Sequence, residues 1–281
     1  MPEASGLSAP AETAETAETV ETADTQRAAV RFWRERWRNQ PWIDRAARDD
    51  DEPWSLPLVV RVEKARPPDH DDAMTAAALA VVRLLAHPAS APDGPWHAVL
   101  ERWMDGRIRK VVRRARGARW TDILDLPGGT AEVAGTEVRA LLPHPVAEVP
   151  PLVSKLQVQG LDLDSDAESG VDRSSPPVES AAGPVLSIVL APGVRMSTGK
   201  ACAQVGHAAQ LGMLQLDEDL VFGWLGAGFP VRIVAGSTRE WNAVLQGEIP
   251  AAVVQDAGYT EVEPGTQTCA ATFAAVTGTS R

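Results

Sequence analysis

Apolar and polar positions follow two regular patterns along the chain, and the same order of patterns occurs twice. Short apolar runs at 58–62 and 186–190 are each followed by an alanine-rich stretch, at 74–85 and 200–214. Short apolar runs predict buried strands, and the longer stretches predict helices. Strands that alternate with helices at this spacing indicate an α/β fold. We expect a three-layer α/β/α arrangement, in which a small mixed sheet carries helices on both faces.

Tryptophans mark matching points in the two halves. Trp103 precedes Gly106 and a strand-like run, as Trp224 precedes Gly228 and a second such run. A further tryptophan follows in a Trp-x-x-(Ile/Val)-Leu frame, at 120–124 and 241–245. We interpret this as an internal duplication whose first copy has lost a segment; chance similarity between short runs is the alternative. The copies would form domains at 50–160 and 184–281, packed as an internal pseudo-dimer or joined across a homodimer.

The remaining segments are polar. Residues 1–26 repeat Ala-Glu-Thr and hold little apolar mass, so they predict a disordered acidic tail. Residues 27–49 predict an amphipathic helical arm that ends before Pro41, with tryptophans at helical spacing among arginines. One interpretation is that the arm binds RNA or a partner protein. We favour the other, in which the arm packs its tryptophans onto the body. Residues 161–183 predict a flexible acidic linker.

Composition narrows the class of protein. The net charge of −11 would argue against an RNA partner, but six acids and no base lie in residues 1–25 and six more acids in 161–184. No apolar run is long enough to cross a bilayer, and no signal peptide is evident. The only two cysteines, Cys202 and Cys269, lack the spacing of a metal site. We expect a cytoplasmic protein with no metal, no cofactor and no membrane contact.

The junction between the second strand and its helix carries polar chemistry. Five residues separate Gly193 from Gly199, and Ala201 stands where a phosphate loop needs Ser or Thr, which argues against a nucleotide triphosphatase. A hydroxyl at 197 or 198 can cap the helix and leave its first amides pointing at an anion site. Lys200, Gln204 and His207 then form one polar stripe on the helix. The alternative is an ordinary solvated helix face.

A second polar segment follows the strand-like run at 251–254. Asp256 and Gly258 come first, and Thr266 and Thr268 open the next apolar run. Taken singly, an acid of this kind more often caps a turn, and a threonine more often fits a strand.

Taken together, the two segments resemble a known family. Residues 199–208 resemble the Gly-Lys-x-Ala-Ala-Gln-x-x-His-Ala signature of the archaeal and eukaryotic peptidyl-tRNA hydrolases, and residues 256–268 resemble that family's Asp-Ala-Gly-Arg-Thr…Pro-Gly-Ser/Thr-x-Thr segment. The resemblance covers about a third of the chain. It implies a hydrolase that cleaves the ester between a peptide, or an N-blocked amino acid, and tRNA, releasing tRNA for translation. It implies a catalytic set of Lys200, Asp256 and Thr268, supported by Gln204, His207, Gly258 and Thr266.

Some features depart from the family pattern. Tyr259 stands where the family usually has arginine, and the second copy has more acids than bases. The alternative function is therefore a catalytically weak or inactive paralogue that acts as an RNA- or protein-binding module.

The first copy predicts a degenerate peptidyl-tRNA hydrolase-like domain, because it lacks the Asp-Ala-Gly segment. It carries a dense basic run, which we call the basic segment: Arg107, Arg109, Lys110, Arg113, Arg114, Arg116 and Arg119. We expect these side chains to bind tRNA phosphates for the second copy. The alternative is an ordinary solvated strand and loop.

Overall fold

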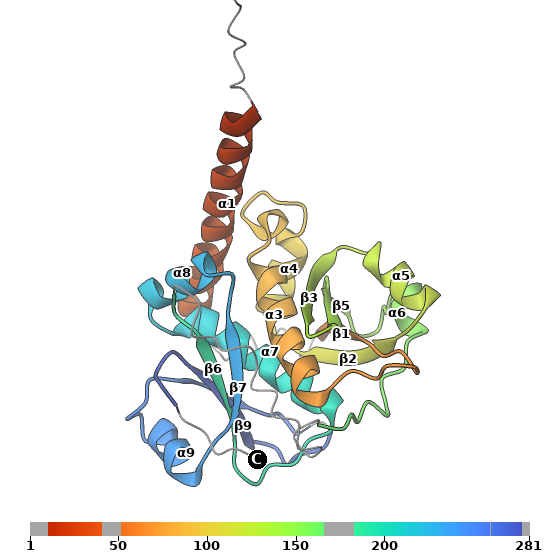
Figure 1. Ribbon diagram of the computed structural model, residues 1–281, viewed down its shortest axis with the longest axis vertical. Coiled ribbons are helices and arrows are strands. Elements are labelled where there is room, and N and C mark those ends of the chain that lie inside the picture. The colour runs from red at the N-terminus through yellow and green to blue at the C-terminus, as the bar shows by residue number, and fades with distance from the viewer. Residues whose placement is uncertain (1–10, 41–51, 166–182, 259, 277–281) are drawn as a thin grey trace, which may run out of the picture.

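The chain forms two sheet-and-helix units that lie side by side (Figure 1). The computed structural model describes residues 11–40, 52–165, 183–258 and 260–276. A long helix, α1 (Ala11–Asn39), precedes both units. The first unit contains β1 (Trp54–Arg61), α3 (His70–Leu85), η1 (Pro88–Ser90), α4 (His97–Met104), β2 (Lys110–Ala115), α5 (Ala118–Leu124), β3 (Gly128–Val133), β4 (Thr136–Leu141), β5 (His144–Pro145) and α6 (Pro151–Ser154). The second contains β6 (Leu186–Leu190), α7 (Thr198–Gln215), α8 (Glu218–Gly226), β7 (Val231–Ala235), α9 (Thr238–Leu245), β8 (Ala252–Gln255) and β9 (Gln267–Thr272).

The two sheets share one strand order. It is β2-β1-β4-β3 in the first unit, where β5 adds to β1, and β7-β6-β9-β8 in the second. In each unit the first strand pairs in parallel with the second and antiparallel with the fourth, which is β4 or β9. A parallel pair needs a crossover connection, which helices supply in both units. The predicted mixed α/β fold is therefore confirmed, and the shared order is consistent with duplication.

The matching tryptophans make the same contact in each unit. The Trp103 indole nitrogen donates to the Arg109 carbonyl at 3.0 Å, and that of Trp224 donates to the Pro230 carbonyl at 2.9 Å. Both tryptophans are completely buried. The same carbonyls accept the amides of Leu56 and Leu186, which lie near the start of the first strand of each sheet. The units therefore agree in tertiary detail as well as in topology.

The helices α3 and α7 pack against each other at the centre of the molecule, between the two sheets (Figure 1). Each also reaches the other unit, since α3 contacts β7 and α7 contacts β2. The largest apolar core accordingly includes side chains from both units. On the outer faces, α5 and α6 cover the first sheet and α9 covers the second, each over a smaller core. Each unit thus has the expected helices on both faces.

Helix α1 bridges the ends of α3 and α7. The Trp33 indole donates to the Leu85 carbonyl at 3.1 Å, and the Arg34 guanidinium donates to the carbonyls of Met213 and Leu216 at 2.5 and 2.7 Å. Carbonyls in the last turn of a helix lack intrahelical partners, so these contacts satisfy them. The prediction that the arm packs its tryptophans onto the body is confirmed for Trp33, which is fully buried.

The expected disorder of residues 1–26 is wrong from Ala11 onward, because α1 begins there. Alanine and glutamate favour helices, and residues 11–26 continue without a break into the turns that pack around Trp33. In Figure 1 this early part of α1 projects away from the body. Residues 1–10 of the predicted tail and residues 41–49 of the predicted arm lie outside the described residues.

The expected flexible linker is also wrong at its start. Leu161 is buried, and its carbonyl accepts the amide of Gly199 at 3.0 Å. The Leu163 amide donates to the Thr198 hydroxyl at 2.8 Å, and the Asp164 carbonyl accepts the His70 amide at 3.1 Å. Residues 161–165 therefore pack against the first turns of α3 and α7, whereas 166–182 lie outside the described residues.

The first unit has a tight turn where the second has a long loop. Strands β3 and β4 are joined through Ala134 and Gly135, whose φ angles are 48° and 85°. Two residues at positive φ are typical of the shortest hairpins. The loop that carries Asp256 and Gly258 in the second unit therefore has no counterpart in the first, as the sequence predicts. Among the described helices, none combines the length and apolarity needed to span a bilayer.

Candidate active site

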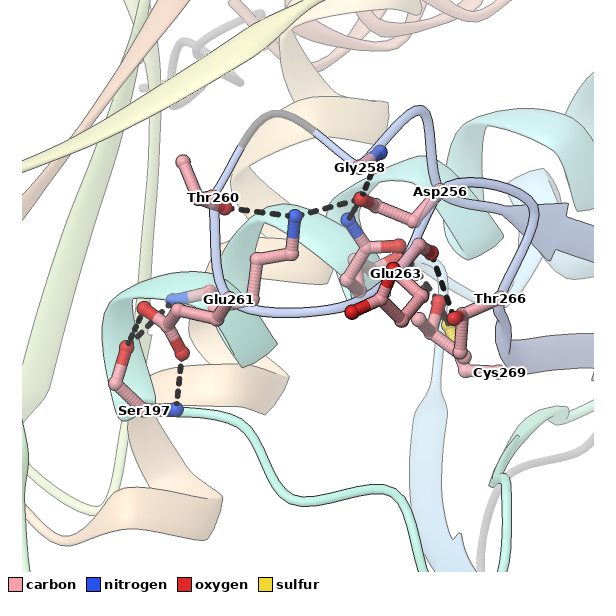
Figure 2. A network of polar contacts seen from close by, with 11 residues as sticks. Ser197, Asp256, Gly258, Thr260, Glu261, Glu263, Thr266 and Cys269 are labelled. Atoms are coloured by element: carbon pink, nitrogen blue, oxygen red, sulfur yellow. Dashed lines mark hydrogen bonds and ion pairs between the residues drawn. The ribbon is translucent and has the colours of Figure 1, made fainter.

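Lys200 and Asp256 form a buried ion pair between α7 and the loop after β8. The Lys200 ammonium lies 2.6 Å from Asp256 Oδ2, and the two side chains are only 10% and 8% exposed. Thr260 accepts a hydrogen bond from the same ammonium at 3.0 Å. In Figure 2, dashed lines from the labelled Thr260 and Asp256 mark these two contacts. Low exposure strengthens an ion pair of this kind, because little water screens it.

Gln204 connects this pair to Thr268. The Gln204 amide nitrogen donates to Asp256 Oδ2 at 2.8 Å, and its amide oxygen accepts the Thr268 hydroxyl at 2.6 Å. Gln204 is 3% exposed and Thr268 is completely buried. We call this set the polar chain: Lys200, Asp256, Gln204 and Thr268. Three residues that the sequence predicts as catalytic, and one predicted as support, are thus brought together from α7, the β8–β9 loop and β9.

Gly258 and Thr266 shape the loop that carries Asp256. The Gly258 amide donates to Asp256 Oδ1 at 2.8 Å, and its φ of +76° suits glycine. A Cβ atom there would lie 2.4 Å from the Cγ of Pro264. The Thr266 hydroxyl donates to the Glu263 carbonyl at 2.7 Å, and its own carbonyl accepts the Asp256 amide. Both residues therefore support the site by fixing the path of the backbone around Asp256.

The helix cap is Ser197, as expected, but its surroundings differ from the expected anion site. The Ser197 amide and hydroxyl both donate to the Glu261 carboxylate, at 2.8 and 2.6 Å (Figure 2). The Lys200 amide donates to the Ser197 hydroxyl, and the Gly199 amide donates to Leu161. These first-turn amides are therefore occupied by oxygens of the chain itself. The physical reason is that two loops, 161–165 and 256–266, converge on this turn.

Thr260 and Glu261 also contact site residues, although neither is among the site residues that the sequence predicts. Thr260 falls within the family-like segment, so its position in the motif was a signal for a site role. Glu261 lies in an irregular loop, and no regular spacing connects it to Ser197.

His207 lies on the same helix but not in the polar chain. Its Nδ1 is 3.1 Å from the ammonium of Lys110, which belongs to β2 of the first unit. Burial, together with the positive charges of Lys110 and Lys200, lowers the pKa of His207 well below its usual value. The imidazole is therefore neutral at pH 7. The predicted support residue sits at the boundary between the units.

The basic segment is only partly open to solvent. Lys110 is buried at the unit boundary, so the expectation that it binds tRNA phosphates is wrong. Arg113, Arg114 and Arg119 each donate to backbone carbonyls between residues 155 and 160. Arg107 and Arg109 are partly buried, and Arg116 and Arg119 are exposed. These three arginines therefore hold residues 155–160 against the rest of the first unit.

Neither cysteine provides a nucleophile. Burial raises the pKa of both Cys202 and Cys269 to about 12, so their thiols stay protonated near neutral pH. The Cys269 thiol lies 3.4 Å from the Gln204 carbonyl, beside the polar chain. The described residues contain no group of three or more histidine, cysteine, aspartate or glutamate side chains arranged to hold a metal ion.

Comparison with known proteins places the second unit in a family. Residues 185–277 match the family model described as peptidyl-tRNA hydrolase PTH2. A peptidyl-tRNA hydrolase of Sulfolobus acidocaldarius is 32% identical over 98 residues, which cover 30% of this chain and 82% of that protein. One from Haloquadratum walsbyi is 36% identical over 90 residues, 30% of this chain and 80% of that protein. One from Metallosphaera sedula is 41% identical over 90 residues, 27% and 74% respectively. Because most of the length of these relatives is matched by the unit that holds the polar chain, this protein belongs to the PTH2 family.

Proposed function

We propose that the protein hydrolyses the ester bond between a peptide, or an N-blocked amino acid, and tRNA, and so returns free tRNA to translation. The matched relatives are named peptidyl-tRNA hydrolases. The observation that carries the proposal is the polar chain, which links an ammonium, a carboxylate, an amide and a hydroxyl within the family-like unit.

Ester hydrolysis needs an activated water and a stabilised oxyanion. In the proposed reaction a water oxygen bonds to the ester carbonyl carbon while Asp256 orients the water or accepts its proton. Lys200 stabilises the negative charge on the carbonyl oxygen. The carbon–oxygen bond to the ribose then breaks, and the ribose oxygen takes up the proton. A carboxylate has about four acceptor positions, so Asp256 can accept from water while it holds Lys200, Gln204 and Gly258.

Thr268 has a more specific part in this arrangement than the motif alone implies. Its hydroxyl proton is directed to Gln204, and the side chain is fully buried. An amide whose oxygen accepts from Thr268 must point its nitrogen the other way, toward Asp256. Thr268 therefore acts through Gln204, which it holds in the orientation that donates to the carboxylate.

Single-turnover cleavage of N-blocked aminoacyl-tRNA tests the assignment. Lys200→Ala, Asp256→Ala and Thr268→Ala are each expected to slow cleavage, with the largest effect at Asp256, while circular dichroism shows a folded protein. Unchanged rates in all three variants would end the catalytic assignment and favour a binding module. The expected compartment is the cytoplasm, where translation uses tRNA.

For tRNA binding, we propose the exposed part of the basic segment, Arg116 and Arg119. Glutamate at both positions should weaken tRNA binding and reduce its dependence on salt, because fewer counterions are released from the phosphates. Arg83→Glu, at an exposed position of α3 in the same unit, is the control. Equal affinities for the double variant and the control would remove these arginines from the tRNA surface. A homodimer stays a prediction, which light scattering of the intact protein would test.

A further inference from the structure

The polar stripe of α7 is contacted from two sides. From its own unit, Asp256 binds Lys200 and Gln204. From the first unit, Lys110 binds His207 and Gln210. Residues three, four and seven positions apart share one face of a helix, so His207 lies beside Lys200 and Gln204 along this stripe. The first unit therefore contacts the catalytic helix next to the polar chain.

The surroundings of Lys110 suit an ammonium group. Its nitrogen lies 3.1 Å from His207 Nδ1, within hydrogen-bond distance of Gln210 Oε1, and 5.0 Å from the centre of the Trp103 ring. Two acceptors and an aromatic face together match the three N–H groups of a lysine. The stem of Lys110 passes over Gly206, where an added Cβ would lie 3.4 Å from the lysine Cδ.

This contact selects one tautomer of His207 when Lys110 carries its charge. A charged lysine nitrogen only donates, so Nδ1 then accepts and the ring proton resides on Nε2. The charged groups near the ring are Lys110 and Lys200, both positive, and with burial they lower the pKa of His207. The ring therefore stays neutral, with a single N–H donor. Burial also lowers the pKa of Lys110 well below its usual value, and the two acceptors and the ring face favour its charged form.

Only the first unit has a lysine at this position of its sheet. Lys110 pairs with Leu56 across the first sheet, and Val231 pairs with Leu186 at the matching position of the second. Although the units share their topology, an amine at this position occurs only where the strand faces the catalytic helix. The first unit has no counterpart of the loop that carries Asp256. It nevertheless carries a polar group directed at the second unit, which contains the polar chain.

We propose that Lys110 is a positioning residue by which the first unit fixes His207 as a neutral Nε2–H donor beside the polar chain, ready to hydrogen-bond the substrate. This inference rests on the proposed hydrolase function for its catalytic consequence. The tautomer itself is independent of that function, so the two are tested separately.

Nitrogen-15 NMR of histidine-labelled full-length protein tests the tautomer. The His207 signals are assigned by their loss in His207→Gln. In the wild type, we expect the pattern of a neutral ring protonated on Nε2 throughout the range from about pH 6 to 8. A ring protonated on Nδ1, or an imidazolium at about pH 6, overturns the proposal without any variant of Lys110.

The variant Lys110→Met keeps the length of the stem and removes the amine. We expect its His207 to lose the fixed tautomer, and the single-turnover rate to fall by roughly tenfold with little change in tRNA affinity, because a group that is no longer held in position contributes less to the reaction. Arg83→Met, which removes a charge from an exposed position of the first unit, should change neither. An unchanged histidine pattern in folded Lys110→Met, or an unchanged rate despite an altered pattern, contradicts the proposal. Failure of the wild type to cleave tRNA esters would instead reject the proposed function, and the NMR result would still stand.

Discussion

Thr268 and Gln204 form the buried end of the polar chain, where each polar atom has one specific partner. The Thr268 hydroxyl donates to Gln204, and Gln204 donates to Asp256. A buried amide that loses its donor costs about 1–3 kcal/mol and can turn over. The orientation of Gln204 therefore depends on a group that does not itself reach the solvent.

Thr268→Val tests that dependence because valine keeps the shape and removes the hydroxyl. We expect the unfolding free energy to fall by about 1–3 kcal/mol and the single-turnover rate to fall by more than about tenfold. Thr272→Val is the matched control, since Thr272 is equally buried on the same strand and donates to Pro250 at 2.7 Å. It should lose similar stability and keep its rate. Equal rates in the two variants would mean that Thr268 is only structural.

The pH dependence of stability follows from His207. Its pKa is lowered in the folded protein, so as the pH falls through about 6.5 the unfolded chain takes up a proton that the native ring does not. The stabilisation is thus present above that pH and is lost below it. The urea midpoint should be lower at about pH 5.5 than at about pH 7.5, and His207→Gln should reduce the difference. His87, whose pKa burial and Arg139 also lower, contributes in the same direction. A pH dependence unaffected by His207→Gln would contradict this assignment.

Much of the site follows from the sequence because its residues lie in two short motifs. The motifs identify Lys200, Asp256 and Thr268, and the helical spacing places Gln204 on the same face as Lys200. The role of Glu261 could not be predicted, since its contact with Ser197 depends on the path of an irregular loop. The sequence predicts a phosphate contact for Lys110, which is wrong, because a basic run does not reveal which of its residues faces a neighbouring helix.

At the scale of elements, α1 connects the two units through backbone carbonyls. Arg34 binds the end of α7 and Trp33 binds the end of α3. Arg36 adds a paired contact to Asp105 after α4. A helix with partners in both units is positioned to stabilise their relative placement.

Arg34→Met should therefore destabilise the whole protein. Arg34 is 4% exposed, and loss of its guanidinium leaves two helix-end carbonyls without donors, so we expect a decrease of about 2–3 kcal/mol in unfolding free energy. Arg38→Met is the control, because the Arg38 side chain is 56% exposed and its ion pair with Glu218 spans 3.7 Å. An exposed pair of this kind is worth less than about 1 kcal/mol. Equal losses in urea denaturation would contradict the bridging role of α1.

Residues 11–26 of α1 and residues 161–165 also show where pattern-based prediction fails for elements. Both segments are polar and acidic, which favours disorder when composition alone is considered. Leu161 is buried against the body, and residues 11–26 continue the helix whose Trp33 is buried there. Whether so few contacts suffice depends on surfaces that distant parts of the chain supply.

At the scale of the molecule, the two units share one core. The α3–α7 contact buries apolar side chains of both, and these side chains form one continuous cluster. The sequence predicts each unit because strand and helix patterns are local. It leaves open whether the units pack within one chain or across a homodimer, since that depends on which faces of α3 and α7 meet.

A shared core predicts cooperative unfolding. Hydrogen exchange should give the slowest amides of β1 and β6 the same opening free energy, equal to the global value from urea denaturation. If the amides of β1 exchanged through an opening that costs well over about 1 kcal/mol less than that of β6, the units would be independent domains.

In the proposed hydrolase, Lys200 and Asp256 act as one catalytic unit on a peptidyl-tRNA ester. The most direct measurement is a double-mutant cycle of single-turnover rates on N-blocked aminoacyl-tRNA, with Lys200→Met, Asp256→Asn and the combination. Residues that act as a unit are strongly non-additive, so the double variant should be about as slow as the slower single variant. Wild-type rates in the single variants, or effects that simply multiply in the double variant, would contradict the account.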